Sequence, residues 1–372
     1  MAIDWKDQTR RGELHAYMIP PQRLDDSYGE LLGVDWSSLS ISAGYYTDTR
    51  TSGSLSIVDG NWIRNSFIRI VYEIPEWDYS CEIGTYAVVS DNAVRRNGSW
   101  ITTLELQSML WTMNKDLTPA PLTLAKGSLA STALKRELDD AGREYVYPFG
   151  ADAKMTGPTA LESGQSKLSR AFILCNWSRT RLDVDGHGRI TCKKYVEPAS
   201  KTPKLSLDLL DERGVVKDGV SRSTDWAEMP SSYILLYKYS DKDANGKSVD
   251  REIRAEVHLV SPKMHQVAAN RGYEVSILES ISDMSPKTYA RAVEIAKQRL
   301  LERTSETVEW EIETKYMPLW EGDVITLTIP DGITDYQGKR KCLVKSIDLT
   351  GPYLDMRMTL KEVYEGVADN DE

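Results

Sequence analysis

A stretch of twelve residues in the second half of the chain matches the spacing of a calcium-binding loop. The segment 241–252 places oxygen-bearing side chains at positions one, three, five and twelve and a glycine, Gly246, at position six. The flanking segments 233–239 and 253–260 alternate like strands, and position eight holds Ser248 where an apolar residue usually anchors the loop. Two interpretations therefore stay open, a calcium site and the polar loop of a hairpin. The candidate ligands are Asp241, Asp243, Asn245 and Glu252.

Two further carboxylates, Asp183 and Asp185, precede a Gly-His-Gly turn. As a calcium loop this segment lacks ligands at positions five and twelve. As an acid and base for glycoside cleavage the two would need a cleft, yet alternation places both on one strand face among polar neighbours. Glycines at 186 and 188 indicate a tight turn between two strands, where positive φ angles are common. We therefore expect a structural hairpin and assign no catalytic residue.

Other motifs for chemistry are incomplete. Gly246-Lys247-Ser248 lacks the earlier glycine of a phosphate-binding loop and is not followed by a helix pattern. The sequence holds neither a Gly-x-Ser-x-Gly elbow nor a His-Glu-x-x-His pair. No cofactor is predicted apart from the open question of calcium. Tryptophans at strand positions, such as Trp100, Trp310 and Trp320, are expected to pack in a core or an interface.

The composition narrows the class of protein. A chain of 372 residues with 41% hydrophobic and 27% charged residues is long enough for two or three domains, and no apolar run reaches membrane-spanning length. The start of the chain is not typical of a secretion signal, so we expect folding in a reducing cytoplasm. The four cysteines are far apart and are expected to be free thiols. A net charge of -10 argues against a protein that binds nucleic acid by neutralising its phosphates.

Periodicity predicts an α+β, mainly β chain. Residues 1–33 read as an N-terminal arm, 34–117 as a first β-barrel with a hairpin at Asn97-Gly98, and 118–197 as an inserted α/β domain. Within the insert we expect a helix over 128–141, a second helix opened by the capping-box spacing of 159–162, and a hairpin over 181–195. Residues 198–364 read as a second β-barrel with a strand-loop insertion near 233–260, and 365–372 as an acidic, disordered tail.

The second β part contains the clearest helix. Ser285-Pro286 is a helix-start signal, and an apolar stripe through Ala292, Ala296 and Leu300 predicts a helix over 286–303 that closes the barrel. The strand after it alternates, with three glutamates on its polar face: Glu309, Glu311 and Glu313.

The order of these parts resembles the central hub proteins of phage tails and baseplates, a family related to the N-terminal part of type VI secretion spike proteins. The residues that carry the resemblance are the hairpin 185–190, which closes the α/β insert, and the helix segment 289–292 followed by Leu319-Trp-Glu-Gly-Asp-Val324. The resemblance implies a homotrimer with two tail-tube-like barrels per chain, so that three chains imitate a six-fold ring.

The implied partners are the tail tube protein or a distal tail protein, the tape measure protein, and a spike, fibre or tip protein. DNA would be a passing cargo and stable membrane binding is not implied. The chain would lie in the virion tail after assembly in the host cytoplasm. Because DNA is a polyanion, an acidic strand face with Glu309, Glu311 and Glu313 could form a channel wall; an ordinary solvated face is the alternative. The rival function is a tail-tip enzyme or carbohydrate-binding module that acts on cell-wall glycans.

Overall fold

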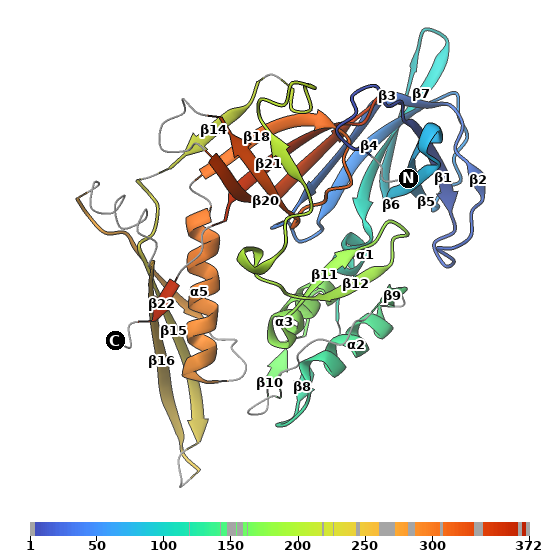
Figure 1. Cartoon of the computed structure of the whole chain (residues 1–372). Helices are drawn as coiled ribbons and strands as arrows, with labels where there is room; N and C mark the ends of the chain where they lie inside the picture. Colours follow the sequence, from blue (N-terminus) through green and yellow to red (C-terminus); the bar gives the residue numbers. More distant parts are fainter. Residues whose placement is uncertain are drawn as a thin grey trace.

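The chain is mainly β, with its helices gathered in two smaller units beside one large sheet (Figure 1). The computed structural model describes residues 4–118, 120–141, 143–146, 154, 159–161, 163–217, 219–225, 227–242, 246–259, 272–281, 287–305, 308–330, 338–363 and 367–369. None of the helices within these ranges is long and apolar enough to span a membrane. The α+β, mainly β class predicted from the sequence is therefore confirmed.

The large sheet has thirteen strands and joins the two predicted β parts. Its middle is the antiparallel pair of β3 (Val34–Gly44) and β20 (Gly338–Thr350), in which Ser40 lies opposite Thr350 and Gly44 lies opposite Ser346. The first β part supplies β1 (Glu13–Ile19), β2 (Gly29–Glu30), β3 (Val34–Gly44), β4 (Thr51–Val58), β5 (Phe67–Ile74), β6 (Tyr79–Arg96) and β7 (Ser99–Ser108), with the short helix η1 (Pro75–Trp77) between β5 and β6.

The second β part supplies the remaining strands of this sheet. They are β13 (Ser206–Asp208), β14 (Ser221–Thr224), β18 (Val308–Lys315), β19 (Val324–Ile329), β20 (Gly338–Thr350) and β21 (Asp355–Glu362). A single apolar core lies along the sheet, because side chains of β1 and β3 belong to the same buried cluster as those of β19 and β21. The described strands pair as a continuous sheet and do not close into a ring of their own.

The α/β insert is a separate layer with its own core. The predicted hairpin over 181–195 and the predicted helix over 128–141 are both confirmed. The elements are α1 (Met109–Lys115), β8 (Leu122–Leu124), α2 (Ala130–Asp140), β9 (Tyr145–Val146), β10 (Thr159–Leu161), α3 (Lys167–Ser178), β11 (Thr180–Val184) and β12 (Ile190–Lys194), followed by η2 (Pro198–Ser200).

The helix start predicted at 159–162 is wrong. Residues 159–161 form β10, which pairs with β8, and helix α3 begins only at Lys167. Its N-cap is Ser166, whose hydroxyl accepts a hydrogen bond from the Ser169 amide. The backbone groups of β10 gain ladder partners that a helix start would not give them, and the local capping signal is overridden.

A four-stranded sheet with one helix forms the third unit. Its strands are β15 (Ser232–Lys242), β16 (Ser248–Leu259), β17 (Ser276–Ile281) and β22 (Val367–Asp369), and its helix is α5 (Tyr289–Ser305). The apolar stripe of α5 packs on this sheet, where Ala292, Ala296 and Leu300 join a core of their own. The helix is therefore present, as predicted, but it covers the four-stranded sheet instead of closing a barrel. The predicted start at 285–286 lies outside the described residues.

Both chain ends differ from expectation. The predicted N-terminal arm contains β1, which pairs with β5 over seven residues and buries Leu14, Ala16 and Met18. Just before it, Trp5 packs edge-on against Tyr316, across the two β parts. The predicted disordered tail contains β22, which pairs with β16. Each end gains ladder hydrogen bonds that a solvated segment lacks.

Candidate functional site

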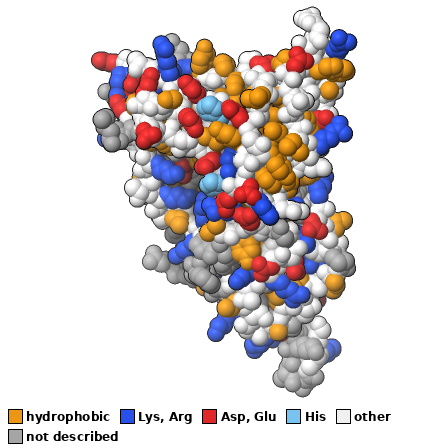
Figure 2. Space-filling model, turned by 90° about the vertical axis from the view of Figure 1, so that its right-hand side faces the viewer, with side chains coloured by type: hydrophobic (Ala, Val, Ile, Leu, Met, Phe, Trp, Pro, Cys, Tyr) orange, Lys and Arg blue, Asp and Glu red, His pale blue; other side chains and the backbone are white. Residues whose placement is uncertain are grey.

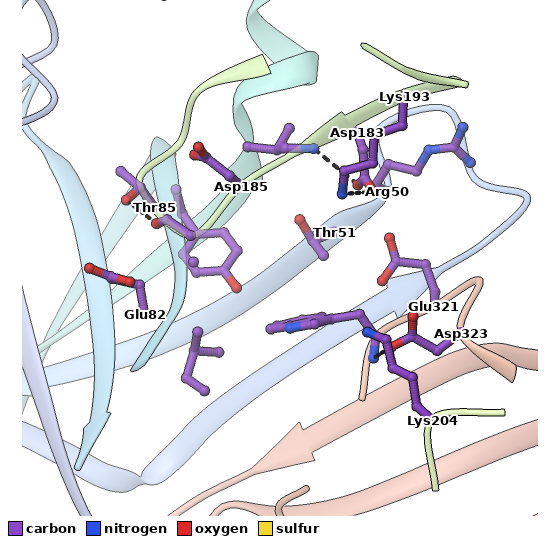
Figure 3. Close-up of a pocket in the computed structure, with 16 residues that line it drawn as sticks. Arg50, Thr51, Glu82, Thr85, Asp183, Asp185, Lys193, Lys204, Glu321 and Asp323 are labelled. Carbon is purple, nitrogen blue, oxygen red and sulfur yellow. Dashed lines mark hydrogen bonds and ion pairs between the residues drawn. The ribbon is translucent and has the colours of Figure 1, made fainter. Parts of the chain in front are cut away.

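The hairpin of the insert and the turn of the second β part, two of the segments that carried the resemblance, meet at one cavity. This cavity, of about 270 Å³, lies where the first β part, the insert and the second β part come together (Figure 3). Charged side chains from all three line it. They are Arg50 near β4, Glu82 on β6, Asp183, Asp185 and Lys193 on the hairpin β11–β12, and Lys204, Glu321 and Asp323 from the second β part.

The hairpin tip is held by side-chain bonds to its backbone. The Thr85 hydroxyl donates to the Gly186 carbonyl at 2.8 Å, and the buried Arg69 guanidinium donates to the His187 carbonyl at 3.1 Å and to Thr85 Oγ1 at 2.9 Å. A Cβ at Gly186 would lie 2.7 Å from Cβ of Glu82, so glycine permits this close approach. The tip of the insert is thereby fixed to strand β6.

The opposite wall is the turn 320–323. Gly322 has φ +87°, and a Cβ there would lie 2.6 Å from the Tyr45 ring. Its carbonyl accepts a 2.7 Å hydrogen bond from Lys201 Nζ, and its amide donates to the Val344 carbonyl. The glycine of the Trp-Glu-Gly-Asp turn is therefore needed for both its backbone angle and its packing.

Glu321 is the most perturbed acid of this site. Its side chain is only 4% exposed, and its Oε1 lies 3.9 Å from Nη2 of Arg181, whose guanidinium stacks 3.7 Å from the centroid of the Tyr45 ring. Burial, reinforced by the charge of Asp183, raises the pKa of Glu321 to about 7, although Arg181 acts in the opposite direction. Burial therefore favours the protonated form of this carboxyl group over that of an exposed glutamate.

The two hairpin aspartates are engaged in structural contacts. Asp185 accepts hydrogen bonds from the Arg189 amide at 2.8 Å and from Arg189 Nε at 2.9 Å, which closes the turn. Asp183 accepts a hydrogen bond from its neighbour's amide and lies 3.5 Å from Lys193 Nζ. The hairpin expectation is confirmed, and these contacts favour a structural use of the pair. The cavity is lined by charged side chains from three parts of the chain and lies at the contact between them.

The three glutamates of β18 lie on its polar face, as the alternation predicted. Each has a basic partner on a neighbouring segment: Lys345 for Glu309, Arg357 for Glu311 at 3.0 Å, and Lys217 for Glu313 at 2.7 Å. Each of these three negative charges therefore has a basic partner within the chain. Whether these side chains face a channel stays a prediction.

The structure does not bring the described calcium candidates together. Residues 243 and 245 lie outside the described residues. Asp241 lies opposite Val249 in the β15–β16 ladder, whereas Glu252 lies opposite Lys238, three residues further along. Three strand steps span about 10 Å, and Glu252 points its carboxylate toward Lys238 at 3.9 Å. In the described residues no group of three or more His, Cys, Asp or Glu side chains is arranged to hold a metal ion.

The tryptophan and cysteine predictions meet different outcomes. Trp310 is buried and its indole donates to Glu362, and the four cysteines are free. Trp320 is partly buried at the cavity. Trp100 is 54% exposed near the tip of the β6–β7 hairpin, so it does not pack in the core, and its use in an interface stays a prediction. Figure 2 shows that acidic and basic side chains are interspersed on the visible face.

Sequence reasoning missed Glu321, Arg181 and Tyr45. Glu321 is part of the turn motif, but nothing in the sequence distinguishes it from an exposed turn glutamate. Its neighbour Arg181, and the Tyr45 ring against which Arg181 stacks, lie far from it in the chain. A signal that could have been used is the Trp before it, which indicates a turn packed on a core.

The sequence matches no protein-family model. It also matches none of the curated proteins with which it was compared.

Solved structures do match the fold. A tail protein from Neisseria meningitidis MC58 is 14% identical, with a TM-score of 0.66 over 94% of this chain and 97% of that one. A 43 kDa tail protein of prophage MuSo2 from Shewanella oneidensis is 13% identical, with a TM-score of 0.62 over 95% and 98%. A chain of the Francisella PdpA-VgrG complex is 10% identical, with a TM-score of 0.52 over 98% of this chain and 55% of that one. The resemblance seen in the sequence is thus confirmed at the level of the fold, which this chain shares with these phage tail proteins and with a chain of the VgrG complex.

Proposed function

We propose that this chain is a structural hub protein of a phage tail tip or baseplate. The observation that carries the proposal is the shared fold with the Neisseria tail protein over nearly the full length of both chains. Each β part would correspond to one tube-like barrel, completed through contacts with neighbouring copies. Three chains would then present six such units, which adapts a six-fold tail tube to a three-fold spike, fibre or tip.

The contacts around the cavity fit the role of a structural adaptor. An adaptor must keep its β parts in a fixed relation while partners bind on either side. Here β20 and β3 pair directly, and the insert is fixed to β5 through Arg69 and to β6 through Thr85. The proposed partners are a tail tube or distal tail protein, the tape measure protein, and a spike, fibre or tip protein. DNA passes without being held, the membrane is not bound stably, and the chain resides in the virion tail after assembly in the host cytoplasm.

The rival function, an enzyme or sugar-binding module for cell-wall glycans, has one observation in its favour. Glu321 has a raised pKa near Asp183, a pattern seen in acid catalysts. Against it, the Glu321 side chain is almost fully buried and Asp183 is paired with Lys193. Incubation with purified cell-wall glycan distinguishes the two, because released sugar would favour the rival.

The mass of the purified protein in solution, alone and with purified tail tubes, tests the leading proposal. We expect three times the 42.0 kDa of one chain, in the free protein or on assembly with tubes. A chain that stays monomeric under both conditions and does not co-sediment with tubes would contradict the hub.

A further inference from the structure

The cavity between the three parts of the chain contains a buried acid without a close basic partner. Glu321 lines it, and the base that faces this carboxylate, Arg181, lies 3.9 Å away, which is too far for a hydrogen bond. Among the described residues, no other residue donates a hydrogen bond to the Glu321 carboxylate. The other carboxylates of the lining each have a closer partner: Asp183 with Lys193 at 3.5 Å, Asp185 with Arg189 at 2.9 Å, Asp323 with Lys204 at 2.8 Å, and Glu82 with His187 at 3.4 Å.

A second buried polar group of the same cavity also lacks a partner. Tyr86 is 2% exposed and lines the cavity, and its hydroxyl forms no hydrogen bond within the described part of the chain. The hydroxyl lies over Gly84, another lining residue, where a Cβ would be 2.6 Å from Oη. Burial raises the pKa of Tyr86 and the charge of Glu321 adds to the effect, so the two groups lie near each other. Because buried polar groups nearly always have partners, the pair indicates an occupant of the cavity.

The basic groups around the cavity are engaged elsewhere. Lys193 and Lys204 have the carboxylate partners just named. The Arg50 guanidinium donates to the carbonyl groups of Tyr45 and Leu182, and the Arg181 guanidinium is stacked 3.7 Å from the centroid of the Tyr45 ring. A cation that enters the cavity would therefore be the first to form a direct hydrogen bond with the buried carboxylate.

The lining favours a flat organic cation. Figure 3 shows Thr51 and Glu321 facing the open space between the hairpin and the turn, and Trp320 supplies an aromatic ring to the same lining. A guanidinium group is planar, stacks on aromatic rings and carries five hydrogen-bond donors, which match a carboxylate and a hydroxyl. A volume of about 270 Å³ admits one such group and is small for a larger ligand.

We propose that this cavity is a binding site for a guanidinium group, held by Glu321 and Tyr86 beside Trp320. The carboxylate accepts two parallel hydrogen bonds from the guanidinium edge, and the tyrosine hydroxyl accepts a third. Tyr86 belongs to β6 of the first β part and Glu321 to the turn of the second, so the occupant also links the two β parts. The inference does not depend on the hub function.

Titration of the full chain with methylguanidinium, followed by nuclear magnetic resonance of the probe, tests the inference. We expect saturable binding with a Kd of about 1 mM, within the range that so small a ligand can reach. Glu321→Gln removes the negative charge and keeps the side-chain shape, and it should weaken binding at least about tenfold. Tyr86→Phe removes one acceptor and keeps the ring, and it should weaken binding roughly threefold to tenfold.

A matched control is Glu76→Gln, the same substitution at an exposed position outside the cavity, which should bind the probe like the unmodified chain. Urea unfolding of Glu321→Gln shows that any loss of binding is not a loss of the fold. Binding should also weaken from pH 8 to pH 6, because protonation removes the charge of Glu321; the other charged groups that face Glu321 are Asp183, Arg181 and Arg50. Absence of saturable binding, or equal binding by Glu321→Gln, would overturn the inference and leave the hub proposal untouched.

Two further probes test selectivity and the source of the guanidinium group. Methylammonium, which carries the same charge without the planar edge, should bind several-fold more weakly, and equal affinity for methylammonium or sodium would overturn the assignment to guanidinium. Arginine blocked at both ends as N-acetyl methylamide presents the group on a peptide backbone. Binding of blocked arginine as tight as that of methylguanidinium supports a site for the arginine side chain of another protein. Binding of methylguanidinium alone supports a site for a small free compound of the same chemistry.

Discussion

The buried carboxyl group of Glu321 makes a quantitative prediction about stability and pH. Its pKa of about 7 in the folded chain lies above the ordinary value of 4.5. A raised carboxyl pKa means that the folded state holds the proton more tightly, so folding is favoured below pH 4.5 and this contribution is lost as the pH rises through 7. A difference of about 2.5 pH units corresponds to about 3 kcal/mol of lost stability at pH 8.

The substitution Glu321→Gln removes this titration and keeps the shape of the side chain. We expect the variant to be more stable than the unmodified chain by about 3 kcal/mol at pH 8 and by less than about 1 kcal/mol at pH 5. For a cooperative chain of this size the difference at pH 8 corresponds to roughly 4 °C in Tm. Urea unfolding and thermal scans at both pH values measure it.

The difference between the two proteins is the relevant quantity, because other carboxylates titrate in the same range and affect both alike. An exposed residue serves as a control: Glu76→Gln lies on the surface and should change stability by less than about 0.5 kcal/mol at either pH. Equal stability differences at pH 5 and pH 8, or a Glu321→Gln variant that is less stable at pH 8, would refute the reasoning about burial.

Three further predictions concern the turn, the N-terminal segment and calcium. Gly322→Ala should lower the free energy of unfolding by about 3 kcal/mol, because a Cβ would meet the Tyr45 ring at a positive φ. Gly98→Ala, also at a positive φ but with open space around it, should lower it by about 1 kcal/mol. Urea unfolding of both variants decides whether the packing clash or the backbone angle contributes more. Trp5→Ala removes three edge-on aromatic contacts and should lower stability by about 2 kcal/mol and expose the N-terminal segment to protease; unchanged proteolysis would show that this segment is not held by its tryptophan. Calorimetric titration with calcium should give no heat and no shift in Tm, since Asp241 and Glu252 are three ladder steps apart, and a saturable heat signal would contradict this.

Local sequence patterns predicted most of the individual helices and strands. They predicted few of the strands or sheets against which these elements pack. The hairpin 181–195, the helix 128–141 and the strand after residue 308 follow from alternation, turn residues and an apolar stripe, all of which are short-range signals. The apolar stripe of α5 also predicts the helix, but it does not indicate which sheet the helix covers. The strands β15 and β16 provide that surface, and they were assigned to an insertion in a barrel.

Two of the predictions were wrong, and the sequence carries a clear signal against the first of them only. Residues 13–19 alternate Leu14, Ala16 and Met18 with polar or larger residues, the period of a half-buried strand, so the arm assignment could have been avoided. At 159–162 a capping-box spacing competed with a weak strand signal, and pairing with β8 decided the outcome. In that case no local rule could have decided, because the partner strand lies more than thirty residues earlier.

The two segments of the candidate site could be predicted from the sequence, but their contact with each other could not. The hairpin and the turn were each identified from their glycines and acids. That they face each other across one cavity depends on contacts such as Thr85 with Gly186 and Arg181 with Glu321, between residues more than a hundred positions apart. Glu321 is buried in that assembly, and burial raises its pKa.

Electron cryo-microscopy of assembled particles tests the central claim most directly. We predict three copies of this chain in a ring at the junction between tail tube and tip, with six β units around a central passage. A tail in which this chain is absent from that junction, or present there as a single copy beside the ring, would contradict it.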